Sequence, residues 1–189
     1  MKKTKTILIL SIVSIIFFGC NKSDNIPKGW FKDGGDPDNY IIGIDDNISK
    51  SGQRSAFIET IEEKEEGFCS LTQYFYVYTD PEKKIKMTGY IKTERAGWAA
   101  MWSNVIDKNS VSLSFDNMSD RPIKGTEDWT KCEIVLDVPK EGHAINFGVL
   151  LSGTGKVWFD DISFEDIDRK NPPIPTEYLF RPTNMDFEE

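Results

Sequence analysis

Two tryptophans that stand four residues apart are the side chains of this sequence best suited to bind a ligand. Trp98 and Trp102 alternate with Ala99 and Met101, so an extended strand would place both indoles on one face and the aliphatic side chains on the other. The flat face of an indole packs against the C–H face of a sugar ring, while polar neighbours bond the hydroxyl groups. The pattern is consistent with a sugar-binding groove, to which Tyr74 would add, and also with two tryptophans buried in a core.

A polar segment further along the chain is the second candidate for ligand binding. Asp116, Asn117, Arg121 and Lys124 place an acid, an amide, a guanidinium and an ammonium group within nine residues, all able to form directed hydrogen bonds. Loops held by a rigid scaffold commonly carry binding sites. The alternative is an internal ion pair, in which Arg121 bonds Asp116 or Asp120 and only orders the loop.

Arrangements typical of enzymes are absent from the sequence. It has no Gly-x-Ser-x-Gly motif, and its single histidine, His143, lies in a Gly-His-Ala turn without a nucleophile signature around it. The segment Ser152–Lys156 lacks the glycine spacing of a phosphate loop. The spacing of the 31 acidic residues singles out no pair of the kind that glycosidases use. We therefore expect a protein that binds without catalysing a reaction.

The elements that must position these side chains are short runs of alternating apolar and polar residues between Gly, Pro, Asp and Asn turns. Eight strands are predicted, at Ser55–Ile61, Phe68–Val77, Lys84–Thr93, Ala99–Val105, Val111–Phe115, Lys131–Val138, Ala144–Leu151 and Lys156–Glu165. No stretch shows the sustained three-four spacing of an amphipathic helix. The sequence therefore predicts an all-β protein, a two-sheet antiparallel β-sandwich (jelly roll) over residues 29–165.

Two cysteines lie in the predicted strands. Alternation places Cys69 on the face of Leu71 and Cys132 on the face of Ile134, so both thiols are expected to point into the core. They can form a disulfide or remain as two small buried side chains, because the sequence does not establish that they are close together.

The beginning of the chain has the pattern of an export signal. Lysines precede an apolar and hydroxyl-bearing run at 7–18, which is too short to span a bilayer as a helix. Gly19 and Cys20 then end the run in a way that resembles a bacterial lipobox, in which the cysteine is lipidated after cleavage. We expect a signal peptide at 1–19 and a tether at 20–28, and the alternative is an ordinary signal peptide or membrane anchor.

The lipid on Cys20 would supply membrane attachment, and no Asp stands at Asn21 to retain the protein at an inner membrane. The expected location is therefore the cell envelope, at the outer membrane of a cell that has two. Removing residues 1–19 takes away three lysines and no acid, so the net charge of −8 becomes −11. Such a charge repels anionic polymers, and nucleic acid is not an expected partner.

Four segments of the sequence together resemble a known family. They are Met87–Glu94, Gly97–Trp102, Asp116–Trp129 and Phe147–Glu165, and the run Asp116–Thr126 is the most specific of them. They are similar to a carbohydrate-binding-module-like, galactose-binding-like jelly-roll family of bacteria, whose members follow regulatory or hydrolase domains. The resemblance covers about residues 29–165 and implies a sandwich with a recognition role. This chain departs from the family by placing the module alone behind a lipobox.

A metal site is a further expectation from the resemblance. Alternation places Asp160 on the face of Trp158 and Ile162, and a carboxylate aimed at a core is costly unless a cation or hydrogen-bond donors meet it. Jelly rolls similar to this family often hold a structural calcium near this strand, which makes Asp160 a candidate ligand and Glu188 the second acid. The alternative is that backbone N–H groups or an arginine satisfy Asp160.

The end of the chain carries a pattern that modules of this family usually have at their beginning. Residues 166–182 contain four prolines and predict an extended strap, and Asn184–Glu188 follows with the pattern Asn-x-x-Phe-Glu. The resemblance implies that this segment adds as an edge strand in place of a missing first strand, with Phe187 filling the core. The alternative is a frayed tail or the remnant of a lost domain.

Together these observations predict a lipid-anchored, non-catalytic binding module of the cell envelope, with a glycan or related polyol as its partner. The second hypothesis is a structural or protein-interaction lipoprotein that binds a partner protein through the same groove. An enzyme is the third, because no residue pattern supports a reaction.

Overall fold

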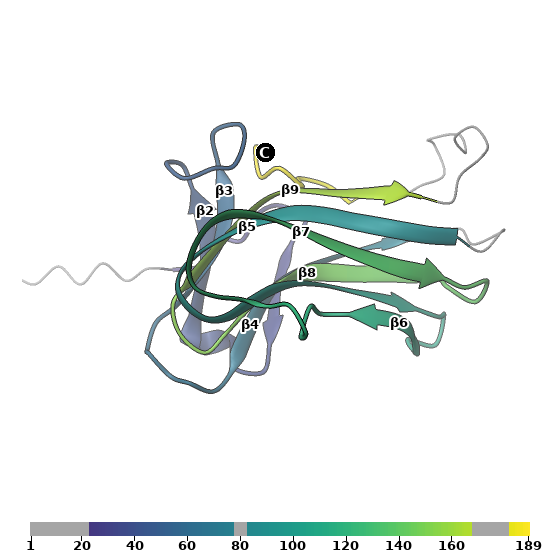
Figure 1. Ribbon diagram of the computed structural model, residues 1–189, viewed down its shortest axis with the longest axis horizontal. Helices are drawn as coiled ribbons and strands as arrows, with labels where there is room; N and C mark the ends of the chain where they lie inside the picture. The colour runs from purple at the N-terminus through teal and green to yellow at the C-terminus, as the bar shows by residue number, and fades with distance from the viewer. Residues whose placement is uncertain (1–22, 78–82, 168–181) are drawn as a thin grey trace, which may run out of the picture.

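The computed structural model describes residues 23–77, 83–167 and 182–189, and nearly all of its regular structure is strand. Its elements are β1 (Phe31–Gly34), the 3-10 turn η1 (Pro37–Asn39), β2 (Tyr40–Asp45), β3 (Ser55–Thr60), β4 (Phe68–Tyr76), β5 (Lys83–Ile106), β6 (Ser112–Asp116), β7 (Ile123–Val138), β8 (Ala144–Ser152) and β9 (Lys156–Asp166). Every paired strand is antiparallel. The predicted all-β antiparallel fold is confirmed (Figure 1).

The strands follow the order β1-β4-β8-β5-β9-β3-β2, with β6 and β7 also paired to β5. The second part of β5, from Trp98, pairs with β8 and β6, whereas its first part pairs with β7 and β9. The change occurs across Ile91–Ala99, where the register with β7 shifts three times and Arg95 has a φ of +50°. Bulges of this kind bend a strand from one layer of a sandwich into the other.

Apolar side chains from all the long strands form one core between the layers. Leu71, Met101 and Phe147 are fully buried there with Ile58 and Phe159. The predicted alternation in β5 is confirmed, because Ala99, Met101 and Val105 are fully buried while the two tryptophans of this strand are half-buried. The strand therefore presents its aliphatic side to the core and its indoles to the opposite face.

Some elements differ from the prediction. β1 and β2 were not expected, because Phe31–Gly34 is short with no buried residue and β2 joins three isoleucines around a glycine without clear alternation. The predicted strands at 84–93 and 99–105 are one strand, β5. β7 begins at Ile123, so the polar segment that starts at Asp116 is a loop only as far as Pro122.

Residues 182–189, which we call the tail segment, do not form the predicted strand. Asn184 and Phe187 have φ values of +49° and +58°, which a β-strand does not allow, and the segment turns instead. The prediction for its side chain is confirmed, because Phe187 is fully buried in the core. The signal peptide with Cys20 and residues 168–181 of the expected strap lie outside the described residues. In the described ranges, no helix is long and apolar enough to cross a membrane.

Candidate functional site

One outer face of the β4-β8-β5 sheet gathers the aromatic side chains. Antiparallel pairing places Trp102 beside Gly148, and Gly148 in turn beside Thr72. Two rows further on the same face, Trp98 lies beside Ser152, which pairs with Phe68. Because directly opposed residues point to the same side of a sheet, these positions share the face that is turned away from the core.

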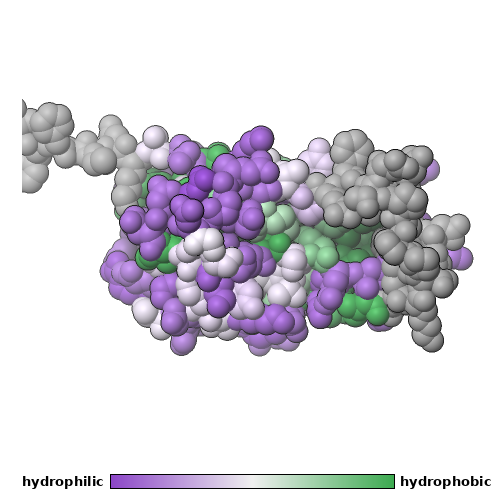
Figure 2. Space-filling view, turned by 90° about the horizontal axis from the view of Figure 1, so that it is seen from above, coloured by the Kyte–Doolittle hydropathy of each residue, from purple (hydrophilic) through white to green (hydrophobic). Residues whose placement is uncertain are grey.

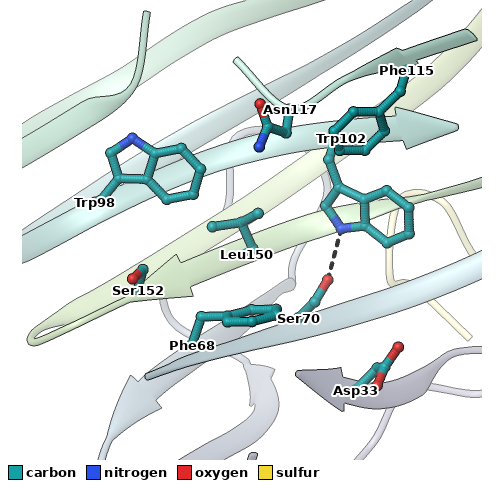
Figure 3. Close-up of a pocket in the computed structure, with 9 residues that line it drawn as sticks. All are labelled: Asp33, Phe68, Ser70, Trp98, Trp102, Phe115, Asn117, Leu150 and Ser152. Carbon is teal, nitrogen blue, oxygen red and sulfur yellow. Dashed lines mark hydrogen bonds between the residues drawn. The ribbon is translucent and has the colours of Figure 1, made fainter. Parts of the chain in front are cut away.

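This face is hollowed into a cavity of about 390 Å³ (Figure 3). Its lining consists of Asp33, Phe68, Ser70, Trp98, Trp102, Phe115, Asn117, Leu150 and Ser152. The side chains come from β1, β4, β5, β8, β6 and the loop after β6. We call it the Trp98–Trp102 cavity. Aromatic walls with a few polar groups between them are the usual composition of a small-molecule site.

Hydrogen bonds through buried hydroxyl groups hold the Trp102 indole in place. Its Nε1–H donates to the Ser70 hydroxyl at 2.8 Å (Figure 3), and that hydroxyl donates to the Val149 carbonyl at 3.0 Å. The Thr72 hydroxyl donates to Ser70 Oγ at 3.2 Å. Ser70 and Thr72 are buried, so the bonds between them and to Val149 are shielded from water and fix the hydroxyl group that orients the ring before any ligand arrives.

A glycine makes room for this arrangement. A Cβ at Gly148 would overlap the Leu71 carbonyl oxygen and would lie 3.0 Å from Trp102 Nε1. The indole can therefore lie over β8 only because this position has no side chain. Sequence reasoning missed Gly148, since no local signal reveals which strand passes beneath Trp102.

The remaining walls are partly open to solvent. Phe68 and Phe115 are exposed, on opposite sides of the Trp98–Trp102 cavity, and Trp98 also packs against the core. The polar groups at the cavity are the Asp33 carboxylate, the Asn117 amide and the hydroxyls of Ser70 and Ser152. This arrangement can cover an apolar ring face and offer donors and acceptors at its edge.

The structure brings three of the predicted binding residues together, Trp98, Trp102 and Asn117. Tyr74 does not line this cavity. It is 47% exposed and borders a second hollow of about 300 Å³, beside Phe31 and Tyr76. The prediction that Tyr74 belongs to the tryptophan groove is therefore corrected, because its position on β4 places it nearer the end of the strand.

Asp116, Arg121 and Lys124 also do not line the Trp98–Trp102 cavity. Arg121 donates to Asp116 Oδ2 at 2.6 Å and to Asp120 Oδ1 at 2.7 Å, and the hydrogen bond with Asp116 raises the pKa of the guanidinium group. This confirms the alternative in which Arg121 orders the loop. Lys124 is exposed on β7, so a ligand role for Asp116, Arg121 and Lys124 in this cavity is not supported by their positions.

The same loop nevertheless serves the cavity by presenting Asn117. Asp116 Oδ1 accepts a hydrogen bond from the Met118 N–H at 2.7 Å, and Met118 is buried with a φ of +56°. Asn117 Oδ1 accepts a hydrogen bond from the Ser119 N–H at 3.2 Å, and the side-chain nitrogen of Asn117 takes no part in this bond. The charged residues of the loop thus position the amide group that reaches the cavity.

The two cysteines are free and buried, which corrects the possible disulfide. Cys69 is in β4 and pairs with Leu151, whereas Cys132 is in β7 and pairs with Gly89, so the two strands do not neighbour each other. Burial raises the pKa of Cys69 to about 12 and that of Cys132 to about 11. The prediction that both thiols point into the core is confirmed.

The surroundings of Asp160 do not fit the expected calcium ion. Its carboxylate accepts hydrogen bonds from the N–H groups of Lys50 at 2.8 Å, Ser51 at 3.2 Å and Asp161 at 2.7 Å. Burial raises the pKa of Asp160, and these bonds only partly offset that effect. Glu188, the proposed second ligand, accepts instead from the turn between β2 and β3.

Both oxygens of the Asp160 carboxylate therefore already accept hydrogen bonds from N–H groups, whereas a calcium ion would need such oxygens as ligands. In the described ranges, no three His, Cys, Asp or Glu side chains are grouped to hold a metal ion. These contacts favour the stated alternative for Asp160, a buried carboxylate satisfied by backbone donors, and the calcium ion expected at Asp160 and Glu188 stays a prediction.

We expect EDTA to leave the melting temperature unchanged, because the stabilising partners of both carboxylates belong to the chain itself. Thermal unfolding of the mature protein in metal-free buffer, with and without EDTA, measures this. A fall of several degrees that added calcium reverses would contradict the donor assignment.

Comparison with known protein sequences gives two informative relatives. The chain is 37% identical over 168 residues to the uncharacterized HTH-type transcriptional regulator YbfP of Bacillus subtilis (strain 168), a match that covers 86% of this chain and 57% of that protein. It is 30% identical over 105 residues to the tRNA(Glu)-specific nuclease WapA of Bacillus subtilis subsp. natto (strain BEST195), covering 52% of this chain and 4% of the nuclease. The chain thus spans little more than half of the regulator. No family model matches it.

Solved structures share the fold at low sequence identity. The xylan-binding domain CBM22-1 of Paenibacillus barcinonensis Xyn10C is 14% identical with a TM-score of 0.53, over 77% of this chain and 88% of that domain. A cyclase from Fischerella sp. TAU is 14% identical with a TM-score of 0.58, over 79% of this chain and 89% of that one. Tailspike protein 4 of bacteriophage CBA120 is 12% identical with a TM-score of 0.60, over 78% of this chain and 21% of that one.

These likenesses define the fold as a β-sandwich of the type found in carbohydrate-binding modules. The same fold is shared with a cyclase, so the fold alone assigns no activity.

Proposed function

We propose that this chain is a non-catalytic binding module for a glycan or related polyol, and that the ligand binds in the Trp98–Trp102 cavity. The observation that carries the proposal is the indole of Trp102, fixed by Ser70 and exposed along one face in an aromatic-walled cavity of about 390 Å³. A rigid aromatic surface next to amide, hydroxyl and carboxylate groups matches a sugar ring, which has an apolar face and a polar rim.

The comparisons are consistent with a recognition module. One structural neighbour is a xylan-binding domain, and the chain covers most of it. The two relatives in sequence, a transcriptional regulator and a tRNA nuclease, differ in activity and share with this chain only part of their length. A segment that occurs in proteins of such different activity fits a recognition role better than it fits either activity.

The composition of the cavity supports binding without catalysis. Glycosidases act with two carboxyl groups about 5–9.5 Å apart. Of the residues that line the Trp98–Trp102 cavity in the described part of the chain, Asp33 is the single carboxylate. The proposal adds that the module is held at the outer membrane by a lipid on Cys20, which rests on the lipobox-like sequence before it.

Purified residues 21–189 are expected to bind at least one member of an oligosaccharide panel that includes xylohexaose and the corresponding gluco-, manno- and galacto-oligosaccharides. Affinities in the micromolar to millimolar range are expected for one exposed cavity of this size. Titration calorimetry of each panel member measures this. Absence of binding across the panel, by protein that unfolds cooperatively, would contradict the proposal.

A further inference from the structure

The tail segment contacts Trp30 just before β1, Gln73 in the middle of β4, β9 and the turn that joins β2 to β3, and we call these surroundings the bay. Figure 1 shows the tail segment beside β9 and this turn. The tail segment shares no residue with the Trp98–Trp102 cavity. Figure 2 shows a mixture of hydrophilic and hydrophobic surface on the face seen from above, with hydrophilic residues predominating over its left half. The contacts of the bay have the character of a peptide-binding site.

Hydrogen bonds to the tail backbone run along one side of the bay. The Gln73 side-chain amide bonds both the N–H of Thr183, at 2.8 Å, and its carbonyl, at 3.0 Å. Trp30 Nε1 donates to the Asn184 carbonyl at 3.0 Å, and the Ile162 N–H donates to the Met185 carbonyl at 3.1 Å. Hydrogen bonds to main-chain groups hold a bound peptide without depending on its side chains.

An aromatic pocket encloses one side chain of the tail segment, that of Phe187. Phe187 has no exposed surface and packs against Trp30 and Phe159, with 5.3 Å between ring centroids in both cases. Trp30 itself packs edge-on against Phe147 in the centre of the core. A fully enclosed aromatic anchor is the feature that dominates binding energy in peptide and protein recognition.

A charge-specific contact follows at the next residue. Glu188 Oε1 accepts hydrogen bonds from the N–H groups of Gln53 at 2.7 Å and Arg54 at 2.9 Å, and these bonds hold the pKa of Glu188 below its usual value. The Arg54 guanidinium donates to the Glu188 carbonyl at 2.6 Å. Gly52 has a φ of +60°, and a Cβ there would overlap the Glu188 carboxylate, so the turn is shaped around this acid.

We propose that this bay is a recognition site for an acidic peptide of the pattern Asn-x-x-Phe-Glu, and that it binds such a peptide when it is presented by a separate chain. The tail segment is then the resident ligand of the site rather than an integral strand. Backbone hydrogen bonds provide affinity for the turned segment, while the Phe187 pocket and the amide groups of Gln53 and Arg54 provide specificity. The proposal does not depend on glycan binding, which concerns another face.

The test uses the full mature chain with a protease cleavage sequence inserted within residues 168–181. After cleavage, the tail segment is expected to remain bound through size-exclusion chromatography. A fluorescein-labelled peptide of residues 182–189 is then expected to replace it, as a rise in fluorescence anisotropy. The matched peptide with Phe187→Ala is expected to bind at least about 100-fold more weakly, because an enclosed phenyl ring is lost.

Three outcomes would overturn the proposal. The cut protein can lose the tail segment without taking up the labelled peptide, or keep it with no exchange, or unfold on cutting. The first shows that the bay has no affinity for the separate peptide, and the other two show that the segment cannot exchange with a peptide from another chain.

Discussion

Replacing Phe187 with alanine is expected to lower the free energy of unfolding by about 3–5 kcal/mol. The ring is fully buried between Trp30 and Phe159, and its removal leaves a cavity that the surrounding strands cannot fill without moving. The fraction of protein unfolded in urea, followed by tryptophan fluorescence, measures the change. A loss of this size is a large part of the stability of an ordinary domain.

Phe115→Ala is the matched control for this experiment. It removes the same side chain from a position that is 55% exposed, and the expected loss is about 1 kcal/mol or less. If Phe187→Ala were no more destabilising than Phe115→Ala, the tail segment would not contribute to the core.

Trp102→Ala is expected to weaken glycan binding by about 1–3 kcal/mol, roughly 5- to 150-fold in Kd. The substitution removes the surface on which the sugar ring rests and leaves the Ser70 hydroxyl without its indole partner. It also opens the space above Gly148, so water enters the floor of the cavity. Titration of the panel member that binds best measures the effect.

Trp129→Ala serves as the control for Trp102→Ala. Trp129 is a half-buried tryptophan on β7 that does not line the cavity, so its loss is expected to leave the Kd unchanged. Equal losses from both substitutions would indicate a general effect on folding, and no loss from Trp102→Ala would place the ligand elsewhere.

The features that sequence alone predicted are those set by local alternation. A period of two along β5 was enough to assign Ala99 and Met101 to the core and the two indoles to the other face. The same reasoning placed Cys69 and Cys132 inside. Each of these inferences needs only the direction of neighbouring side chains within one strand.

Features that depend on register between distant strands were not predictable. Tyr74 was assigned to the tryptophan groove because aromatic type was the only available signal, whereas pairing with Asn146 places it beside a second hollow. Gly148 lies beneath Trp102 because β8 and β5 pair in one register among many. Which distant strands pair, and in which register, cannot be inferred from the residues of either strand alone.

The tail segment and Asp160 are two further features that could not be predicted from the sequence alone. The pattern of residues 184–188 suggested a strand, and only the positive φ of Asn184 and Phe187 shows that the buried ring is delivered by a turn. Two of the three donors that satisfy Asp160 are the backbone N–H groups of Lys50 and Ser51, more than one hundred positions away. Backbone groups have no sequence signature, so a cation was the partner that residue types suggested.

The most direct test of the proposed binding face uses the indole N–H signals of the protein in a ¹H–¹⁵N correlation spectrum. The chain has five tryptophans, and each gives one such signal: Trp30, Trp98, Trp102, Trp129 and Trp158. Titration with the oligosaccharide that binds best is expected to shift the signals of Trp98 and Trp102 and to leave the other three in place. Shifts confined to Trp30, Trp129 or Trp158, with Trp98 and Trp102 unchanged at saturation, would contradict the assignment of the cavity as the glycan site.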